Sequence, residues 1–381
     1  MPALSRRGVA SARGFGLFRA AAAGPPPVPG PGLWTWGNNG NGNLGIGNTT
    51  QYSSPKHVGA LTTWATVSAG GSSGLAVKTD GTLWSWGYNA FGQLGLGDVT
   101  NRSSPVQVGA LTAWSKVTAG SNFGVAIKTD GTLWSWGSNA HGKLGLGNTT
   151  SYSSPKQVGA LTNWATVEDM GSAVLAVKTD GTLWSWGQGS YGKLGLGNTT
   201  FYSSPKQIGA LTTWSTVSGG NFHALAVKTN GTLWSWGANF SGSCGLGNTT
   251  YYSSPVQVGA LTAWSKVSGG NAYASFAIKT DGTMWAWGQG SYGRLGLGNT
   301  TDYSSPKQIG ALTTWSKIVG SGYKFGLAIK TDGTLWSWGK NTQGQLGLGN
   351  LTSYSSPKQV GALTTWSVAS GGDFFSLGIY T

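Results

Sequence analysis

The stretch Asp80-Gly81-Thr82-Leu83-Trp84-Ser85-Trp86-Gly87 decides the fold of this chain, because close copies of it return at an almost fixed spacing along the sequence. The first tryptophan of its Trp-x-Trp-Gly core recurs at Trp34, Trp84, Trp134, Trp184, Trp234, Trp285 and Trp336. A third tryptophan accompanies each copy, which accounts for all 21 tryptophans in the 381 residues. A repeat of about 50 residues with strand-like segments is typical of a propeller or a solenoid.

One copy, residues 64–109, predicts four short strands. Residues 64–70 and 75–79 read as the first two, and residues 83–87 place both tryptophans on one face of a third. Residues 105–108 begin with a proline, which suits an outer edge strand, and Asp80-Gly81 favours a type I′ turn before the third strand. The sequence therefore predicts an all-β fold, a seven-bladed β-propeller of four-stranded antiparallel blades.

The two ends of the repeat region predict how the ring closes. Residues 375–381 match a second strand with no third strand after it, whereas residues 32–37 match a third strand with no second strand before it. Pairing the two completes one blade shared between the N- and C-termini and removes the free sheet edges. Tryptophans at a fixed phase in every copy are expected to pack between blades rather than to form a sugar-binding platform.

The first 32 residues differ in composition from the repeats. Residues 1–23 contain arginine, alanine and serine without any acid, and residues 24–32 form a proline- and glycine-rich linker. This segment resembles an organelle transit peptide, and a disordered tail or a mis-assigned start explains it equally well. We therefore expect a tail or targeting segment over residues 1–32 and one monomeric propeller over residues 33–381.

Composition narrows the classes of function. The net charge is +14 with only 9% charged residues. One lysine recurs at the same place in six copies, a ring of spaced charges that fits a solubilised surface better than a nucleic-acid site. These lysines are Lys78, Lys128, Lys178, Lys228, Lys279 and Lys330. No stretch approaches the roughly 20 apolar residues of a membrane span.

Residues with metal-binding or catalytic potential are few. The single cysteine, Cys244, replaces a leucine of the repeat and is expected to be a small buried hydrophobe. His57, His141 and His223 stand in different copies at different phases, and Glu168-Asp169 is an adjacent acidic pair without a visible partner. The sequence therefore predicts no metal site, no cofactor and no catalytic activity.

The repeat resembles that of the regulator of chromosome condensation (RCC1) family. The resemblance rests on residues 80–87, on the run Asn89-x-x-Gly-Gln-Leu-Gly-Leu-Gly97 and on Ser104-Pro105-x-x-Val108, and it covers residues 33–381. It implies a seven-bladed propeller closed by a shared blade. For the founding member of the family, the resemblance implies nucleotide exchange on a small nuclear GTPase, carried out by a β-wedge inserted in its propeller. No blade of this chain carries an insertion longer than one residue. Only His223 keeps the histidine that is usual in this family's second strand.

The copies differ from one another mainly in three places. These are the turn between the first and second strands, the start of the long connection after the third strand, and a later point of that connection, at residues such as 51, 201, 251 and 302. Strand direction puts all three on one rim of the ring, opposite the Asp-Gly turns. Phe, Tyr and His on such loops are typical of a protein-recognition surface, and drift between duplicated copies is the alternative explanation.

We therefore predict a non-catalytic scaffold that binds a macromolecular partner, a protein, through this rim. The predicted partner-binding residues are Ser73, Tyr88, Phe91, Asn122, Phe123, His141, Tyr191, Phe222, His223, Phe240, Tyr273, Tyr292, Tyr323, Lys324 and Phe374. Three alternatives stay open at this point: RCC1-type exchange on a small GTPase with chromatin association, glycan binding, and nucleic-acid binding through the basic tail.

Overall fold

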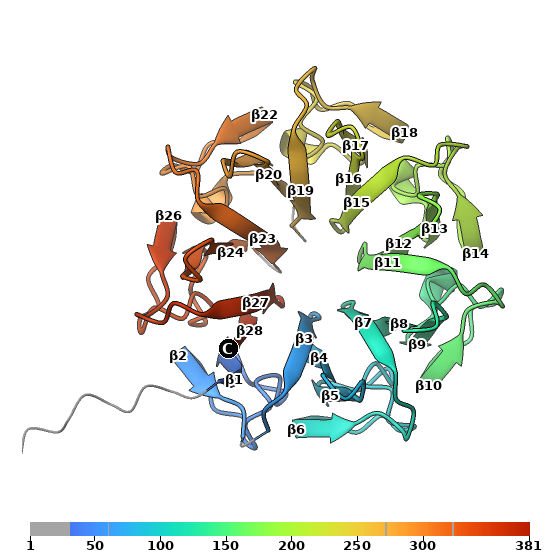
Figure 1. The fold of residues 1–381 in the computed structure, drawn as a ribbon, viewed down its shortest axis with the longest axis vertical. Coiled ribbons are helices and arrows are strands. Elements are labelled where there is room, and N and C mark those ends of the chain that lie inside the picture. The colour runs from blue at the N-terminus through green and yellow to red at the C-terminus, as the bar shows by residue number, and fades with distance from the viewer. Residues whose placement is uncertain (1–30, 60, 271–272, 322–323) are drawn as a thin grey trace, which may run out of the picture. The chain divides into compact units, whose positions relative to one another are not determined.

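The computed structural model describes residues 31–59, 61–270, 273–321 and 324–381, which belong to one propeller unit. Seven four-stranded sheets surround a central axis (Figure 1), so the predicted fold class is confirmed. The predicted tail lies outside the described residues apart from residues 31 and 32, and its separation from the propeller stays a prediction. The predicted binding residue Tyr323 also lies outside the described residues.

Six blades are built from four consecutive strands each, with the first strand innermost (Figure 1). They are β3 (Trp64–Ala69), β4 (Ser73–Lys78), β5 (Leu83–Gly87) and β6 (Arg102–Gln107); β7 (Trp114–Ala119), β8 (Phe123–Lys128), β9 (Leu133–Gly137) and β10 (Tyr152–Gln157); β11 (Trp164–Asp169), β12 (Ala173–Lys178), β13 (Leu183–Gly187) and β14 (Tyr202–Gln207); β15 (Trp214–Gly219), β16 (His223–Lys228), β17 (Leu233–Gly237) and β18 (Tyr252–Gln257); β19 (Trp264–Gly269), β20 (Ala274–Lys279), β21 (Met284–Gly288) and β22 (Tyr303–Gln308); and β23 (Trp315–Ser321), β24 (Phe325–Lys330), β25 (Leu335–Gly339) and β26 (Tyr354–Gln359). Short 3₁₀ helices lie in four of the long connections: η1 (Ala140–Gly142), η2 (Ser190–Gly192), η3 (Phe240–Gly242) and η4 (Ser291–Gly293).

The seventh blade joins the two ends of the repeat region, as predicted. It contains β27 (Trp366–Gly371), β28 (Phe375–Tyr380), β1 (Gly32–Gly37) and β2 (Tyr52–His57), in the order β2-β1-β28-β27. The antiparallel pairing of β1 with β28 runs from Gly32 opposite Tyr380 to Gly37 opposite Phe375, and Figure 1 shows blue β1 beside red β28. This ladder closes the ring with backbone hydrogen bonds.

The tryptophans pack between blades, which confirms their predicted core role. Trp86 and its six equivalents are completely buried. Trp86 Nε1 donates a 3.0 Å hydrogen bond to the carbonyl oxygen of Asn43 in the preceding blade, and each equivalent indole makes the same bond. Trp64 is also buried, with its ring edge-on to Trp84 and Trp86 at centroid distances of 6.1 and 6.3 Å. Trp86 and its six equivalents therefore bury a large apolar area while their polar N–H groups stay satisfied.

The recurring lysines lie over these tryptophans. Lys78 Nζ is 4.8 Å from the ring centroid of Trp84 and 5.4 Å from that of Trp64, and the five equivalent lysines lie over the equivalent pairs. Such contacts combine cation–π attraction with apolar packing of the lysine stem. The six charges thus lie one to a blade in six of the seven blades, with Tyr380 at this place in the shared blade, which supports the interpretation as spaced charges.

The turn between the second and third strands corrects one prediction. A type I′ turn needs positive φ at both central residues, yet Gly81 has a φ of +77° while that of Asp80 is not positive. Gly81 N donates to Lys78 O at 2.9 Å and Lys78 N donates to Thr82 O at 3.0 Å, the pattern of a three-residue loop with a glycine bulge. Asp80 Oδ1 accepts from Thr82 Oγ1 at 2.7 Å, and Thr82 Oγ1 accepts from Trp84 Nε1 at 2.9 Å. The Asp-Gly-Thr-x-Trp run is therefore one hydrogen-bonded unit.

The fourth strand starts earlier than predicted. In the first complete blade it begins at Arg102 rather than at Pro105. Arg102 pairs with Gly87 and Val106 with Ser85, and the register shifts between these pairs. Pro105 lies in this irregular part of an edge strand, where its missing N–H costs no ladder hydrogen bond.

Two predictions from composition can be compared with the structure. Cys244 is completely buried in the position of the repeat leucine, as expected. Burial raises the pKa of its thiol to about 12, so the thiol is protonated at neutral pH. Within the described ranges, no helix has the length and apolarity that crossing a membrane requires.

Candidate functional site

The two variable segments of each copy meet at one end of the blade. Tyr88 N donates a 2.9 Å hydrogen bond to Ser72 O, and Ser138 N donates to Asn122 O over the same distance. The remaining blades repeat this bond between the turn after the first strand and the start of the long connection. The two segments therefore lie side by side, as predicted, and we call this end of the propeller the variable rim.

Five aromatic side chains from three neighbouring blades gather on the variable rim. They are Tyr191, Phe222, Phe240, Tyr251 and Tyr273, and we call them the aromatic patch. Tyr191 contacts Phe222 and Phe240 at centroid distances of 6.0 and 5.5 Å. Phe240 contacts Tyr251 at 5.0 Å and Tyr273 at 5.2 Å, and Phe222 stacks on Tyr273 at 5.4 Å. Tyr191 and Tyr251 are 43% and 44% exposed and the other three rings are half-buried.

The backbone fixes the position of two of these rings. Tyr191 lies in the middle of η2 with a φ of +62°, and Tyr273 has the same φ just before β20. The left-handed conformation costs a non-glycine residue roughly 1–2 kcal/mol. A 3.0 Å hydrogen bond from Gly192 N to Gly189 O closes the turn that contains Tyr191. The rest of the fold thus sustains a strained backbone that presents the ring outwards.

A second group on the rim combines lysines with aromatic rings. Lys324 Nζ lies 4.6 Å from the ring centroid of Tyr292, and Lys340 Nζ lies 5.4 Å from both Tyr292 and Phe374. We call these four residues the cationic group. Tyr292, Lys324 and Phe374 are among the predicted binding residues, whereas Lys340 is not.

The remaining rim residues form smaller contacts. Tyr88 lies edge-on to Phe91 at 6.4 Å, and His141 lies edge-on to Phe201 at 5.1 Å. Phe201 and Tyr251 were missed as site residues, although their variation between copies could have revealed both. The predicted residues that reach the surface are Tyr88, Phe91, Asn122, His141, Tyr191, Phe222, Phe240, Tyr273, Tyr292, Lys324 and Phe374. Their role in binding a partner stays a prediction.

Three predicted binding residues are wrong, because the structure places them in the core. Ser73, Phe123 and His223 are 2%, 1% and 0% exposed. Each is the first residue of its second strand, so the exposed turn is shorter than the sequence indicated. His223 Nε2 lies 2.7 Å from Ser275 Oγ, and burial lowers the pKa of His223 to about 4. A partner cannot touch these side chains in the folded propeller.

The side chain at the first position of the second strand varies in size between copies, because the residue three positions earlier changes in size in the opposite sense. A Cβ added at Gly120 would lie 2.2 Å from the ring of Phe123, so a large side chain at the position of Phe123 requires a glycine at the position of Gly120. Where the small Ala173 takes this position, Met170 replaces the glycine and is completely buried. The variation therefore records close packing rather than recognition.

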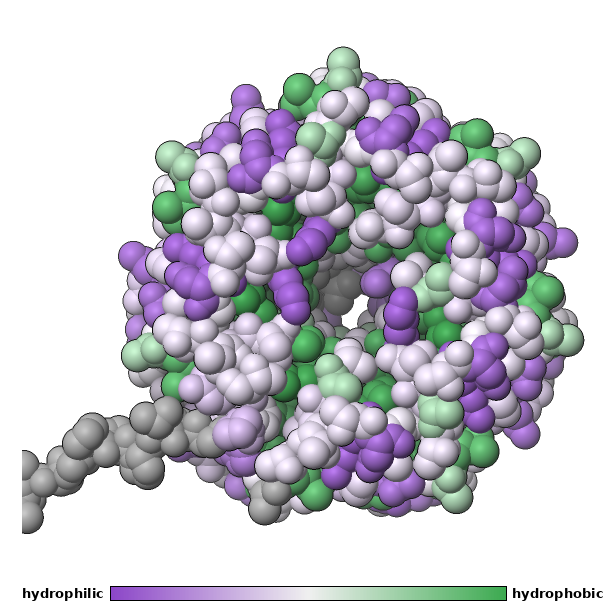
Figure 2. All heavy atoms as spheres, viewed as in Figure 1, coloured by the Kyte–Doolittle hydropathy of each residue, from purple (hydrophilic) through white to green (hydrophobic). Residues whose placement is uncertain are grey.

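The central channel contains an acidic pair that breaks the repeat. Figure 2 shows the channel as a hollow bordered by both hydrophilic and hydrophobic side chains. At the end of β11, Glu168 lines two channel cavities of about 370 and 120 Å³ and Asp169 lines the smaller one, where the other described copies have no acid. Burial raises the pKa of Glu168 to about 8 and that of Asp169 to about 7. The positive charge of Lys193 lowers the pKa of Asp169 and so offsets part of the effect of burial. The described residues hold no cluster of three His, Cys, Asp or Glu side chains placed for a metal ion.

Comparison with known families agrees with this geometry. The "Regulator of chromosome condensation (RCC1) repeat" matches residues 32–77, 80–127, 130–170, 180–227, 230–277, 281–329 and 332–379. A second description of the same repeat matches residues 64–93, 114–143, 214–243 and 317–345. The fold is that of a β-propeller built from repeats. The matches show that the chain belongs to the RCC1 repeat family.

Curated relatives match only a part of this chain. The human "Probable E3 ubiquitin-protein ligase HERC6" is 42% identical over 92 residues, which are 23% of this chain and 9% of that protein. The Arabidopsis thaliana "Ultraviolet-B receptor UVR8" is 32% identical over 91 residues, which are 24% and 21% of the two chains. The chain thus spans less than a quarter of the length of these relatives in the matched segments.

Solved structures match the whole propeller. Human WBSCR16 superposes with a TM-score of 0.83 at 20% identity and covers 93% of this chain and 99% of its own. Prp20p from Saccharomyces cerevisiae superposes with a TM-score of 0.82 at 19% identity and covers 92% of each chain. At this level of identity the similarity establishes the fold alone.

Proposed function

We propose that this propeller is a non-catalytic scaffold that binds a protein partner through its variable rim, with the aromatic patch as the anchor. The observation that carries the proposal is the contact network of Tyr191, Phe222, Phe240, Tyr251 and Tyr273 across three blades. Aromatic anchors of this kind dominate the binding energy of many protein interfaces.

The chemistry of the patch favours a protein surface as its occupant. Its five rings carry no formal charge, so covering them requires no desolvation of an ion. Tyrosine supplies a large apolar area together with one hydroxyl, which is why it is enriched in interfaces. The cationic group on the same rim provides positive charges that can orient an acidic side chain of the partner.

The rigidity of the patch lowers the entropic cost of binding. All five rings make edge-to-face contacts with one another, and the backbone at Tyr191 and Tyr273 is held in the left-handed region by the fold. Side chains that are ordered before binding lose little rotamer freedom on association. The patch is therefore prepared to act as a preformed anchor.

Solved relatives offer an analogy for protein binding. One structure is described as Kap60 bound to yeast RCC1 (Prp20), and another describes the binding of Prp20p to Gsp1p and histones. These partners belong to the yeast protein. For this chain, exchange on a small GTPase stays an alternative, and a nucleotide-release assay with purified small GTPases tests it.

A substitution series tests the proposed anchor. In the variant F222A/F240A/Y273A the patch loses three of its rings, whereas Y88A/F91A removes an aromatic pair elsewhere on the rim and serves as the matched control. Proteins that are cross-linked to the wild-type and control chains should be lost from the patch variant. Loss of a hot-spot ring weakens binding by about 2 kcal/mol or more, which is roughly thirtyfold. Equal capture by all three folded chains would refute the anchor.

A further inference from the structure

Cavities repeat between neighbouring blades at positions that include none of the aromatic patch. Three of them measure about 420, 320 and 390 Å³. Each is lined by a Gly-Leu-Gly turn, a glutamine at the end of a fourth strand, the leucine of the following link, two tryptophans and a Ser-Pro pair of the next blade. Volumes of this size suit a small ligand or a single ring of a larger one.

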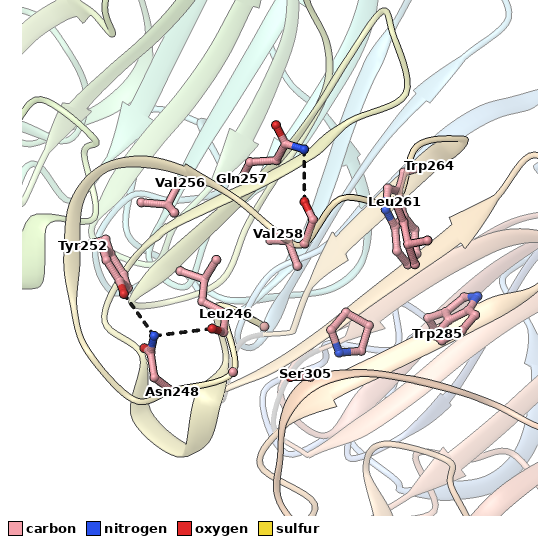
Figure 3. A pocket seen from close by; sticks show the side chains of 14 residues that line it. Leu246, Asn248, Tyr252, Val256, Gln257, Val258, Leu261, Trp264, Trp285 and Ser305 are labelled. Atoms are coloured by element: carbon pink, nitrogen blue, oxygen red, sulfur yellow. Dashed lines mark hydrogen bonds between the residues drawn. The ribbon is translucent and has the colours of Figure 1, made fainter.

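The largest of these three pockets has Val256 where the equivalent position beside the other two is a lysine. In five other blades a lysine of the fourth strand lies over a tyrosine ring four residues earlier, at centroid distances of 5.0 to 5.7 Å. At this position β18 has Val256, and none of the described lysines lies over Tyr252. Tyr252 and Asn248 therefore line the pocket here, whereas their equivalents do not line the other two cavities. We call this cavity the Tyr252 pocket (Figure 3).

The lining of the Tyr252 pocket is apolar and aromatic, with a few hydrogen-bonding groups. Trp264, Trp285 and Leu261 lie on one side in Figure 3, facing Tyr252 and Asn248 on the other. Asn248 Nδ2 donates to Tyr252 Oη at 3.1 Å, and this bond orients both side chains. Gln257 Nε2 is engaged with Gly259 O at 3.0 Å, and its carbonyl oxygen can accept a further bond.

Charge and hydrogen bonding restrict the class of ligand. None of the 14 lining residues is charged, so a charged ligand would find no counter-ion among them and would be desolvated at a large cost. Lys279 Nζ, outside this lining, lies over the rings of Trp264 and Trp285. A purely apolar ligand would cover the remaining acceptor of the wall, the carbonyl oxygen of Gln257, without offering it a hydrogen bond. A neutral ring with apolar C–H faces and several hydroxyl groups satisfies both kinds of lining.

An unsatisfied indole marks the inner wall. Trp264 is 2% exposed, and its Nε1 has no hydrogen-bond partner in the protein. The indoles of Trp164 and Trp214, which line the other two cavities, are unpaired in the same way. Trp64 and Trp114 at the equivalent position instead donate to the carbonyl oxygens of Leu61 and Leu111 at 2.9 and 3.2 Å. A buried donor without an acceptor costs about 1–3 kcal/mol. A ligand hydroxyl that enters as the half-exposed Leu261 side chain shifts would supply the acceptor.

From these observations we infer that the Tyr252 pocket binds a neutral hexopyranose, free or at the end of a glycan. The C–H faces of the sugar pack against the half-buried rings of Tyr252 and Trp285, and its hydroxyls meet Asn248, Gln257 and Ser305. This site is separate from the protein-binding rim proposed above, and the two can be lost independently.

The repeat itself supplies the test variants. Val256→Lys installs the residue that five other blades carry at this position, so it should fold normally while placing a lysine over Tyr252. Lys206→Val is the reciprocal change and should uncover the Tyr202 ring in the neighbouring blade. Val106→Lys is the matched control, because Arg102 stands there in place of the tyrosine.

Methyl glycosides of glucose, mannose, galactose and fucose are the probes, and saturation-transfer NMR with the full chain is the readout. At least one glycoside should bind with a millimolar dissociation constant, V256K should weaken it at least roughly tenfold, K206V should add a second site, and V106K should match the wild type. Absence of binding by every glycoside, or equal binding by V256K, would overturn the inference. Binding of N-acetyl-phenylalanine amide that V256K abolishes, without any glycoside bound, would assign the pocket to peptide side chains and overturn it too.

Discussion

Replacing His223 by phenylalanine should remove a defined part of the acid sensitivity of this propeller. His223 is completely buried, its Nε2 lies 2.7 Å from Ser275 Oγ, and its Nδ1 has no partner. Phenylalanine stands at the equivalent position in three other blades, as Phe123, Phe325 and Phe375, so the substitution suits the site.

The magnitude follows from the pKa of the histidine. Burial lowers the pKa of His223 from 6.5 to about 4, because the imidazolium would be desolvated. Below pH 6.5 His223 binds a proton in the unfolded chain but stays neutral in the folded chain. The folded state therefore loses free energy of unfolding as pH falls from about 6.5 towards 4. One pH unit in this window is worth about 1.4 kcal/mol, so at pH 5 the loss is about 2 kcal/mol.

Urea denaturation of wild-type and H223F chains at pH 7.5 and pH 5 measures this effect. Titration of every other group is shared, so the difference between the two chains should grow by about 2 kcal/mol on acidification. His141→Phe removes a histidine from the exposed rim and serves as the control. Parallel pH dependences of the wild type and H223F would refute the reasoning, because they would place His223 in contact with water or with a charge partner.

Three further outcomes concern the channel, the core and the closure. Glu168→Ser introduces the residue found at Ser68 and should stabilise the fold by about 1–3 kcal/mol at pH 8 and by less at pH 5, because Glu168 has its pKa raised to about 8 in the partly buried channel. An equal gain in urea denaturation at both pH values would contradict this. Trp136→Ala should cost about 3–5 kcal/mol by the same method, because it leaves a cavity and strips Gln93 O of its donor, and a loss below about 1 kcal/mol would place this indole outside the core. Deletion of residues 375–381 removes the strand between β1 and β27 and should abolish cooperative thermal unfolding, and an unchanged transition followed by circular dichroism would count against the shared blade.

The repeat made the fold predictable in detail. The spacing of the tryptophans gave the blade number, and the incomplete strands at residues 32–37 and 375–381 gave the closure, because ring closure follows from strand order alone. The turn around Asp80 was less predictable, because the Asp-Gly dipeptide occurs both in type I′ turns and in glycine bulges. The side chain of Thr82, which bonds both Asp80 and Trp84, belongs with the second form.

The candidate site was only partly predictable. Variation between copies located the rim, yet it could not separate exposed variation from compensated core variation, as Phe123 with Gly120 and Ala173 with Met170 illustrate. The contacts within the aromatic patch depend on how neighbouring blades are placed in space. Variation between copies therefore pointed to its residues but could not show which of them touch. The sequence shows that Val256 replaces a lysine present in five other copies. Only the structure shows the consequence, because it places the Tyr252 ring in the pocket.

Site-specific photo-crosslinking tests the proposed rim most directly. A benzophenone side chain is placed in turn at Tyr251 in the aromatic patch, at Phe91 elsewhere on the rim, and at the exposed Leu111 of the link beside the Asp-Gly turns. In the native lysate, position 251 should yield a discrete cross-linked protein that position 111 does not yield, with position 91 marking the edge of the contact. A product at position 111 without one at position 251 would contradict binding through the aromatic patch.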